Sequence, residues 1–271
     1  NMRKILISLV FLVTTAFGAQ AQTTALQELS TGNDARGWEA VGRLDLDGRG
    51  FCTGALIAPD LVLTAAHCMF DRASGSEFDP SRIEFHAGLR GGRAEASRTV
   101  RSAVLHPSYA HTEDTSPDTV RYDVALLQLD RPIRSTRIAP FEVSNSVRSG
   151  TEISVVSYAQ DRSEAPSLQE TCNILGHQDG VLVMDCSVNF GSSGAPIFGD
   201  ENGVPRLVSV VSAMAKLNGE KISLGADLAE PIAILRLALA QGRGLFGSPP
   251  TSARVIRQGE RADTGALFVR P

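Results

Sequence analysis

The 271-residue chain is 42% hydrophobic, 21% charged and 6% aromatic, a composition typical of folded globular proteins and not of disordered, collagen-like or multi-spanning membrane proteins. Its 26 basic and 30 acidic side chains give a net charge of −4, so no basic excess exists for binding a nucleic-acid backbone. We therefore expect one large domain or two of modest size, and no nucleic-acid partner.

The first residues have the pattern of a secretory signal. Arg3 and Lys4 precede an apolar run over 5–17, and Ala19 and Ala21 have the spacing of small residues at a cleavage site. The run is shorter than the ~20 apolar residues that cross a membrane as a helix, so a retained anchor is the less favoured alternative. We expect a signal peptide over 1–21, export to the periplasm or the extracellular space, and no stable membrane insertion after cleavage.

Export affects how the four cysteines are interpreted, because an oxidising compartment favours disulfides over free thiols or metal ligation. Four cysteines permit three pairings, and the chain has no C-x-x-C motif. Pairing of neighbours closes two loops of about 15 residues, each stabilising by ~3 kcal/mol. We predict Cys52 with Cys68 and Cys172 with Cys186, and we expect no metal and no other cofactor.

Short runs rich in Val, Ile, Leu and Thr alternate with turn residues along the chain, which is typical of an all-β protein. The first six expected strands are 39–46, 51–57, 61–64, 83–87, 99–105 and 124–129. A stretch without strong periodicity over 131–149 is followed by six more, at 152–158, 170–175, 181–185, 195–198, 207–213 and 222–228. Two sets of six predict two similar barrels, because closure leaves few exposed strand edges.

One convincing helix is expected over 231–241, with Pro231 at its start and Gly242 just past its end. The expected organisation is a signal peptide (1–21), an N-terminal barrel (22–135), a C-terminal barrel with the helix (136–242) and a C-terminal tail (243–271). Within the tail, 266–269 is apolar enough to add an edge strand.

Three short segments hold residues suited to nucleophilic catalysis. His67 follows the apolar run 61–66, Asp123 opens the run 123–129, and Ser193 lies in the small-residue turn 190–196. Each alone has an ordinary structural explanation, as a structural histidine, a capping aspartate or a loop serine. Their order is informative, because an α/β-hydrolase has its histidine after the serine, and none of the five histidines follows Ser193.

Other kinds of catalytic or metal-binding site fit the sequence less well. A subtilisin-like order needs an aspartate before the histidine, which Asp45, Asp47 or Asp60 formally supplies, but the alternation of strands and helices is absent. No H-E-x-x-H zinc motif is present. The acidic stretch 71–84 lacks the EF-hand pattern and is expected to be a solvated loop. The three other histidines outside the strands are expected at the surface or in loops; they are His106, His111 and His177.

At the three candidate residues the sequence resembles the chymotrypsin-like (trypsin-like) serine peptidases, in particular their bacterial exported branch. The segments 64–68, 123–127 and 191–196 are similar to the histidine, aspartate and serine motifs of that family, in the same order. The likeness reaches from about Trp38 to Gln241. It implies an all-β fold of two six-stranded antiparallel barrels packed roughly perpendicular to each other, with a C-terminal α-helix and a site in the cleft between the barrels.

The resemblance also implies the role of each site residue. His67 is expected to be the general base, Asp123 its orienting partner and Ser193 the nucleophile. The backbone N–H groups of Gly191 and Ser193 are expected to form the oxyanion hole. Ser192 replaces the usual aspartate, so the ion pair with a freed N-terminal ammonium is not available, and the position is closer to glutamyl endopeptidases. Ala195 replaces a usual glycine.

Substrate preference depends on positions that the resemblance places around the specificity pocket. They are Ser187, six residues before the nucleophile, and the wall formed by Ser212, Ala213 and Met214. None is charged, and Val211 stands where glutamyl endopeptidases have a histidine, so we expect a preference for small or medium uncharged side chains.

The sequence therefore predicts an exported, monomeric serine endopeptidase whose partners are protein or peptide substrates. The alternative is a catalytically weak or inactive protein of the same fold that uses its cleft or tail for binding. Ser192, Ala195 and the tail keep this alternative open.

Overall fold

The computed structural model describes residues 23–112, 114–144 and 149–246. The expected signal peptide over 1–21 and the expected strand at 266–269 lie outside these residues. Within the described part of the chain, no helix has the length and apolar character needed to cross a membrane.

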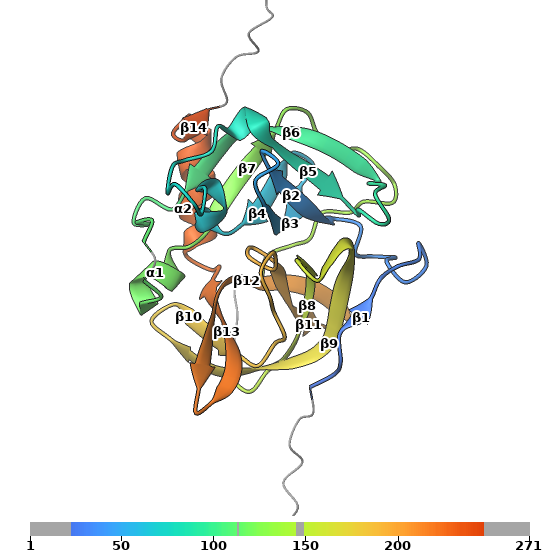
Figure 1. Ribbon diagram of the computed structural model, residues 1–271, viewed down its shortest axis with the longest axis vertical. Helices are drawn as coiled ribbons and strands as arrows, with labels where there is room; N and C mark the ends of the chain where they lie inside the picture. Colours follow the sequence, from blue (N-terminus) through green and yellow to red (C-terminus); the bar gives the residue numbers. More distant parts are fainter. Residues whose placement is uncertain (1–22, 113, 145–148, 247–271) are drawn as a thin grey trace, which may run out of the picture.

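The first half of the chain forms a closed six-stranded antiparallel barrel (Figure 1). Its strands are β2 (Val41–Leu46), β3 (Phe51–Ala58), β4 (Leu61–Thr64), β5 (Ile83–Ala87), β6 (Ala96–Leu105) and β7 (Ala125–Leu129). They follow the order β6-β5-β2-β3-β4-β7, and pairing of β6 with β7 closes the ring. The loops carry two 3₁₀ turns and one short helix, η1 (Ala66–Met69), η2 (Pro80–Arg82) and α1 (Pro117–Arg121).

The second half repeats this architecture. Its strands are β8 (Glu152–Ala159), β9 (Arg162–Gln178), β10 (Val181–Met184), β11 (Pro196–Glu201), β12 (Val204–Leu217) and β13 (Glu220–Asp227). They follow the order β9-β10-β13-β12-β11-β8, and pairing of β8 with β9 closes the ring. The prediction of two six-stranded antiparallel barrels is confirmed. Figure 1 shows one barrel above the other.

Both ends of the described chain cross to the opposite barrel. β1 (Gln27–Glu28) pairs with β9 of the second barrel, although it precedes the first. Helix α2 (Pro231–Ala240) and β14 (Leu245–Phe246) follow the second barrel but lie beside the first, where β14 pairs with β6 (Figure 1). The sequence placed β1 in the N-terminal barrel and β14 in the C-terminal tail. In the structure β1 pairs with the second barrel and β14 with the first, and these pairings tie the two barrels together.

An apolar cluster lies between the barrels. A single cluster of buried side chains runs from the interior of the first barrel into the second, where Tyr158 and Phe198 belong to it. Trp38 lies over Phe198 with ring centroids 5.0 Å apart, and Phe141 lies 4.6 Å from the same ring. Burial of this much aromatic surface holds the barrels in one relative position.

Both predicted disulfides are present. The bond between Cys52 and Cys68 joins β3 to η1, and the bond between Cys172 and Cys186 joins β9 to the segment that follows β10. Each therefore restrains a segment that leads to one of the candidate catalytic residues.

Candidate active site between the two barrels

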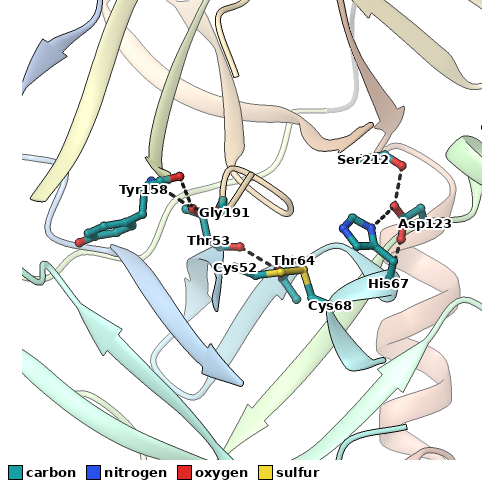
Figure 2. Close-up of a disulfide and its surroundings, with 9 residues drawn as sticks. All are labelled: Cys52, Thr53, Thr64, His67, Cys68, Asp123, Tyr158, Gly191 and Ser212. Carbon is teal, nitrogen blue, oxygen red and sulfur yellow. Dashed lines mark hydrogen bonds and ion pairs between the residues drawn. A yellow bond between two sulfur atoms is a disulfide. The ribbon is translucent and has the colours of Figure 1, made fainter. Parts of the chain in front are cut away.

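His67 and Asp123 are brought together by the pairing of β4 with β7. Thr64, the last residue of β4, lies opposite Ala125, the first residue of β7. His67 follows in η1, and Asp123 lies two residues before the start of β7. The Nδ1 atom of His67 lies 2.7 Å from one carboxylate oxygen of Asp123, and the backbone N–H of His67 donates to the other oxygen at 2.8 Å (Figure 2). Two contacts thus fix the imidazole relative to the carboxylate.

A third donor to Asp123 comes from the second barrel. The hydroxyl of Ser212, on β12, donates to Asp123 Oδ2 at 2.5 Å (Figure 2). Asp123 is only 2% exposed, and a buried carboxylate is costly unless it is hydrogen-bonded. The sequence placed Ser212 only in the substrate wall, since no local pattern reveals a contact between residues 89 positions apart.

The surroundings of His67 raise the pKa of its imidazole above the usual 6.5. Burial by itself lowers that pKa, but the negative charge of Asp123 and the hydrogen bond to it together outweigh burial, while the charge of Arg72 opposes them. The side chain of His67 is 31% exposed, and Nδ1 is occupied by Asp123. Nε2 is therefore the nitrogen that remains to exchange a proton with a substrate.

The turn that carries Ser193 is fixed by its carbonyl groups. The carbonyl of Phe190 accepts from the N–H of Gln160 at 2.7 Å. The hydroxyl of Thr53, on β3 of the first barrel, donates to the carbonyl of Gly191 at 2.9 Å (Figure 2). The N–H of Thr53 donates to the carbonyl of Ser193, also at 2.9 Å. Thr53 therefore holds the serine turn against the barrel that carries His67.

Two N–H groups of this turn remain without an acceptor among the described residues, those of Gly191 and Ser193. In a trans peptide the N–H points opposite to the carbonyl. The carbonyl of Phe190 is bound to Gln160 and that of Ser192 accepts from the N–H of Ala195 at 2.9 Å, so the two free N–H groups point away from these partners. Two unpaired backbone N–H groups beside a serine are suited to bind an oxyanion.

Glycine is required at two positions of the turn. Gly191 has φ +94°, and a Cβ atom there would lie 2.3 Å from a ring carbon of Phe51. Gly194 has φ +73°, and a Cβ atom there would lie 2.0 Å from the hydroxyl oxygen of Thr64. Contacts this short do not occur, so only glycine lets the second barrel approach the first at Ser193.

The predicted catalytic residues line one cleft of about 1430 Å³ between the barrels. His67 and Asp123 enter it from the first barrel, and Ser193 and Gly191 from the second. The predicted wall also lines the cleft, with Ser212, Ala213 and the 42% exposed Met214. No hydrogen bond joins Ser193 Oγ to His67 among the described residues, and such bonds are often long before substrate binds.

Ser187 does not line this cleft. Its side chain is exposed, and its backbone N–H donates to the buried amide oxygen of Gln169 at 2.7 Å. Its role at the base of the specificity pocket stays a prediction.

The two departures from the family pattern are accommodated by small neutral groups. Ser192 is fully buried; its hydroxyl donates to the carbonyl of Tyr158 at 3.2 Å and accepts from the N–H of Asn189 at 3.3 Å. Ala195 is fully buried in the core of the second barrel. A neutral hydrogen-bonded residue therefore stands where other family members place a charged one.

Candidate metal ligands are few in the described residues. Cys52, His67 and Cys68 lie close enough together to share an ion, but the two sulfur atoms form a disulfide, which leaves one ligand. Asp71, in the acidic loop, accepts from two backbone N–H groups and pairs with Arg49 at 2.6 Å. Its carboxylate is thus used to shape the loop.

His106 lies in a loop, one of the two expected places, but it is buried there. It lies in the loop after β6 but is only 4% exposed, and its ring stacks on that of Tyr122 with centroids 4.7 Å apart. Burial lowers the pKa of this imidazole below its usual value. A single histidine in a loop has no periodic pattern, so the sequence did not reveal its burial.

Comparison with known proteins agrees with this geometry. A model of the trypsin-like peptidase domain matches residues 52–205, which is 154 of 271 residues. The chain is 28% identical over 152 residues to the glutamyl endopeptidase of Bacillus licheniformis, covering 55% of this chain and 45% of the relative. It is 39% identical over 84 residues to coagulation factor XII of Sus scrofa, covering 30% of this chain and 12% of the relative. The matches thus span less than half of either relative.

A solved structure of Glu endopeptidase in complex with MPD superposes on the chain with a TM-score of 0.66 and 20% identity. The match covers 84% of this chain and all of the other, and it shows that the two share a fold. The paired barrels, the three motifs and a family match over more than half of the sequence agree, and the chain belongs to the trypsin-like peptidase family.

Proposed function

We propose that the chain is an exported serine endopeptidase that hydrolyses peptide bonds through an acyl-enzyme on Ser193. One observation carries this proposal. A hydrogen-bonded His67–Asp123 pair, Ser193 and the two unpaired N–H groups beside it all border the same cleft. A base, a nucleophile and an anion site are the three parts that acyl transfer needs.

The proposed mechanism has two half-reactions that use the same groups. Ser193 Oγ attacks the carbonyl carbon of the substrate, and its proton passes to Nε2 of His67. Asp123 holds the N–H at Nδ1 and stabilises the imidazolium that forms. The oxyanion receives hydrogen bonds from the N–H groups of Gly191 and Ser193. His67 then protonates the leaving amine, and water repeats the sequence to release the acid.

We propose that activation does not use an ion pair at position 192. A carboxylate there would need a cation, such as a freed N-terminal ammonium, to offset its burial. Ser192 is instead satisfied by the carbonyl of Tyr158 and the N–H of Asn189. The serine turn is therefore held in shape without a charge.

The cleft wall supports a preference for small or medium uncharged side chains before the scissile bond. Val211, Ala213 and Met214 line this side of the cleft, and none of them can neutralise a buried charge. Exposed Met214 narrows the space with a flexible apolar group. The glutamyl endopeptidase relative is named for another preference, and the chain lacks a histidine at Val211.

Export and a monomeric state belong to the same proposal. The N-terminal pattern of Arg3, Lys4, the apolar run and Ala19-x-Ala21 supports export. Both disulfides are formed, which suits an oxidising compartment. Protein or peptide chains are the expected partners.

A peptide-library digest tests the proposal. The wild-type protein is expected to cleave library peptides after small or medium uncharged residues, and Ser193→Ala is expected to cleave none. Ser135→Ala, an exposed serine in the connection between the barrels, serves as the matched control and should cleave like the wild type. Equal cleavage by wild type and Ser193→Ala contradicts the mechanism. A wild type that cleaves nothing favours the alternative of an inactive binding protein, and cleavage after Arg or Lys contradicts the proposed preference.

A further inference from the structure

The active-site cleft contains an arginine whose charge the mechanism does not use. Arg72 lies in the loop after η1, is exposed and lines the cleft. Its guanidinium carbon is 4.6 Å from the ring centroid of Phe190. Phe190 belongs to the second barrel, directly precedes Gly191 and is 48% exposed. The contact between Arg72 and Phe190 therefore spans the cleft beside the oxyanion site.

A second arginine of the cleft shows what is unusual about Arg72. Arg49 also lines the cleft and also lies 4.6 Å from a phenylalanine ring, that of Phe78. Its guanidinium, however, is paired with Asp71 at 2.6 Å and with Asp47 at 2.9 Å. Arg72 has no carboxylate within ion-pair distance and donates no hydrogen bond among the described residues. The edge of its guanidinium is open to whatever occupies the cleft.

The position of Arg72 relative to the reacting groups can be assigned from its neighbours. Arg72 follows Cys68 by four residues, and its charge is close enough to lower the pKa of His67. Figure 2 shows the disulfide on one side of the His67 imidazole and Ser212 on the other. Phe51, next to this disulfide, packs against Gly191. Arg72 thus lies on the disulfide side of the cleft, away from the wall that begins at Ser212.

The two sides of the cleft take different parts of a substrate. In the proposed function the wall at Ser212–Met214 lies along the part that becomes the acyl-enzyme. The part that leaves as the amine then lies on the disulfide side, beside Arg72 and Phe190. A guanidinium stacked on an aromatic ring keeps its edge N–H groups free, and these match the two oxygens of a carboxylate.

We infer that Arg72 is a specificity-determining residue that binds an acidic side chain of the substrate on the C-terminal side of the scissile bond. This inference rests on the proposed peptidase function. It assigns a preference to the departing half of the substrate, separate from the preference for an uncharged residue before the bond.

Paired quenched fluorescent peptides test this inference. The two peptides share one sequence, chosen from the library digest, and differ only in Glu or Gln at the first or second residue after the cut. The wild type is expected to cleave the Glu peptide with a kcat/KM about fivefold higher, the range of an exposed ion pair, and this ratio should fall as salt is raised. Arg72→Gln should bring the ratio to about one, and Arg72→Lys should retain part of it.

Two further variants make the test specific. Arg101→Gln removes an exposed arginine of β6 outside the cleft and should keep the wild-type ratio. Arg72→Glu should invert the preference, so that a peptide with Lys after the cut is cleaved faster than its Gln counterpart. In Arg72→Gln the acid limb of the kcat/KM profile should also move to higher pH, since the charge that lowers the pKa of His67 is gone.

The outcomes separate this inference from the function on which it rests. If Arg72→Gln lowers kcat/KM for both peptides by the same factor, Arg72 only braces Phe190 and the inference is wrong. A wild type that cleaves Glu and Gln peptides equally also overturns it, while leaving the peptidase function intact. A wild type that cleaves neither peptide overturns both.

Discussion

The two barrels contribute to the site in opposite ways. The first contributes a hydrogen-bonded pair of side chains, since Asp123 binds His67 through two contacts and leaves only Nε2 of the imidazole free. The second contributes backbone whose polar atoms are left open, the N–H groups of Gly191 and Ser193. A base works because its partner raises its proton affinity, whereas an anion site works because no partner fills it before the substrate arrives.

Each barrel also supports the half-site of the other. Thr53, from the first barrel, holds the carbonyl groups of Gly191 and Ser193. Ser212, from the second, donates to Asp123. The two halves of the site are therefore coupled through the docking of the barrels, and a substitution in either barrel tests this coupling.

The largest effect on activity is expected at the His67–Asp123 pair. Asp123→Asn keeps the size of the side chain but exchanges an acceptor oxygen for a donor, so His67 loses the partner that fixes its tautomer. If the proposed mechanism holds, we expect kcat to fall about 10⁴-fold, as the same change does in a serine protease with a Ser–His–Asp triad. Steady-state hydrolysis of a quenched peptide measures it, with exposed Asp161→Asn as control. A fall of less than tenfold contradicts the role of Asp123.

The next largest effect on activity is expected at the unpaired N–H groups of the serine turn. Gly191→Ala places a Cβ atom against Phe51 at a positive φ, which displaces one oxyanion donor. We expect kcat to fall about 10²- to 10³-fold. Gly203→Ala is the matched control, because Gly203 has a similar φ of +82° but open space around it. If both variants lose activity equally, backbone strain and not the oxyanion donor explains the loss.

A smaller effect is expected at the link between the barrels. Thr53→Val removes a buried hydroxyl that donates to Gly191 and accepts from the N–H of Tyr158. The carbonyl and the N–H left unpaired should lower the free energy of unfolding by about 1–3 kcal/mol. Urea denaturation measures this, and Thr99→Val on β6, which breaks no side-chain hydrogen bond among the described residues, should change it by less than about 0.5 kcal/mol. If the two variants have the same free energy of unfolding, the hydrogen bonds of the Thr53 hydroxyl do not stabilise the fold.

The smallest effects are expected from pH, and they differ in sign between two histidines. The raised pKa of His67 puts the acid limb of kcat/KM above pH 6.5, and Asp123→Asn should lower it. Because its folded-state pKa is raised, His67 stabilises the fold below pH 6.5 and loses this contribution as pH rises through its folded pKa. His106 has a lowered pKa, so its contribution is present above pH 6.5 and is lost as pH falls below that value.

Urea denaturation between pH 5 and pH 8 separates the two histidines. His106→Gln should reduce the loss of unfolding free energy on the acid side, because the variant has no imidazole to protonate on unfolding. His67→Gln should instead reduce the loss on the alkaline side. Identical pH profiles for both variants and the wild type would show that neither shift contributes measurably to stability.

Local patterns predicted much of this molecule. Two strands, 61–64 and 83–87, match β4 and β5 to the residue; the first is a short apolar run, and the second alternates apolar and polar side chains. Neighbour pairing of the cysteines followed from loop length, and it is present. The three motif residues were found from their types and order, and the structure places all of them at one cleft.

Contacts between distant segments could not be predicted in this way. β1 and β14 have two residues each, too few for any periodicity. The sequence therefore did not indicate that each pairs with a strand of the opposite barrel. The hydrogen bonds of Ser212 to Asp123 and of Thr53 to Gly191 join residues from different barrels. The far end of the β12–β13 hairpin is exposed from Lys216 to Lys221, so burial left no pattern there, and β12 and β13 extend beyond the expected runs 207–213 and 222–228.

Labelling with a fluorophosphonate tests most directly whether the His67–Asp123 pair and the unpaired N–H groups of the serine turn act on one serine. The reagent reacts only with a hydroxyl that a base has activated, and its adduct places a negative oxygen where the Gly191 and Ser193 N–H groups point. Intact-protein mass spectrometry with peptide mapping should find one adduct, on Ser193, in the wild type, and an at least 10³-fold slower reaction in His67→Ala. A wild type that takes no label, or a His67→Ala variant that reacts at the same rate, would contradict the account.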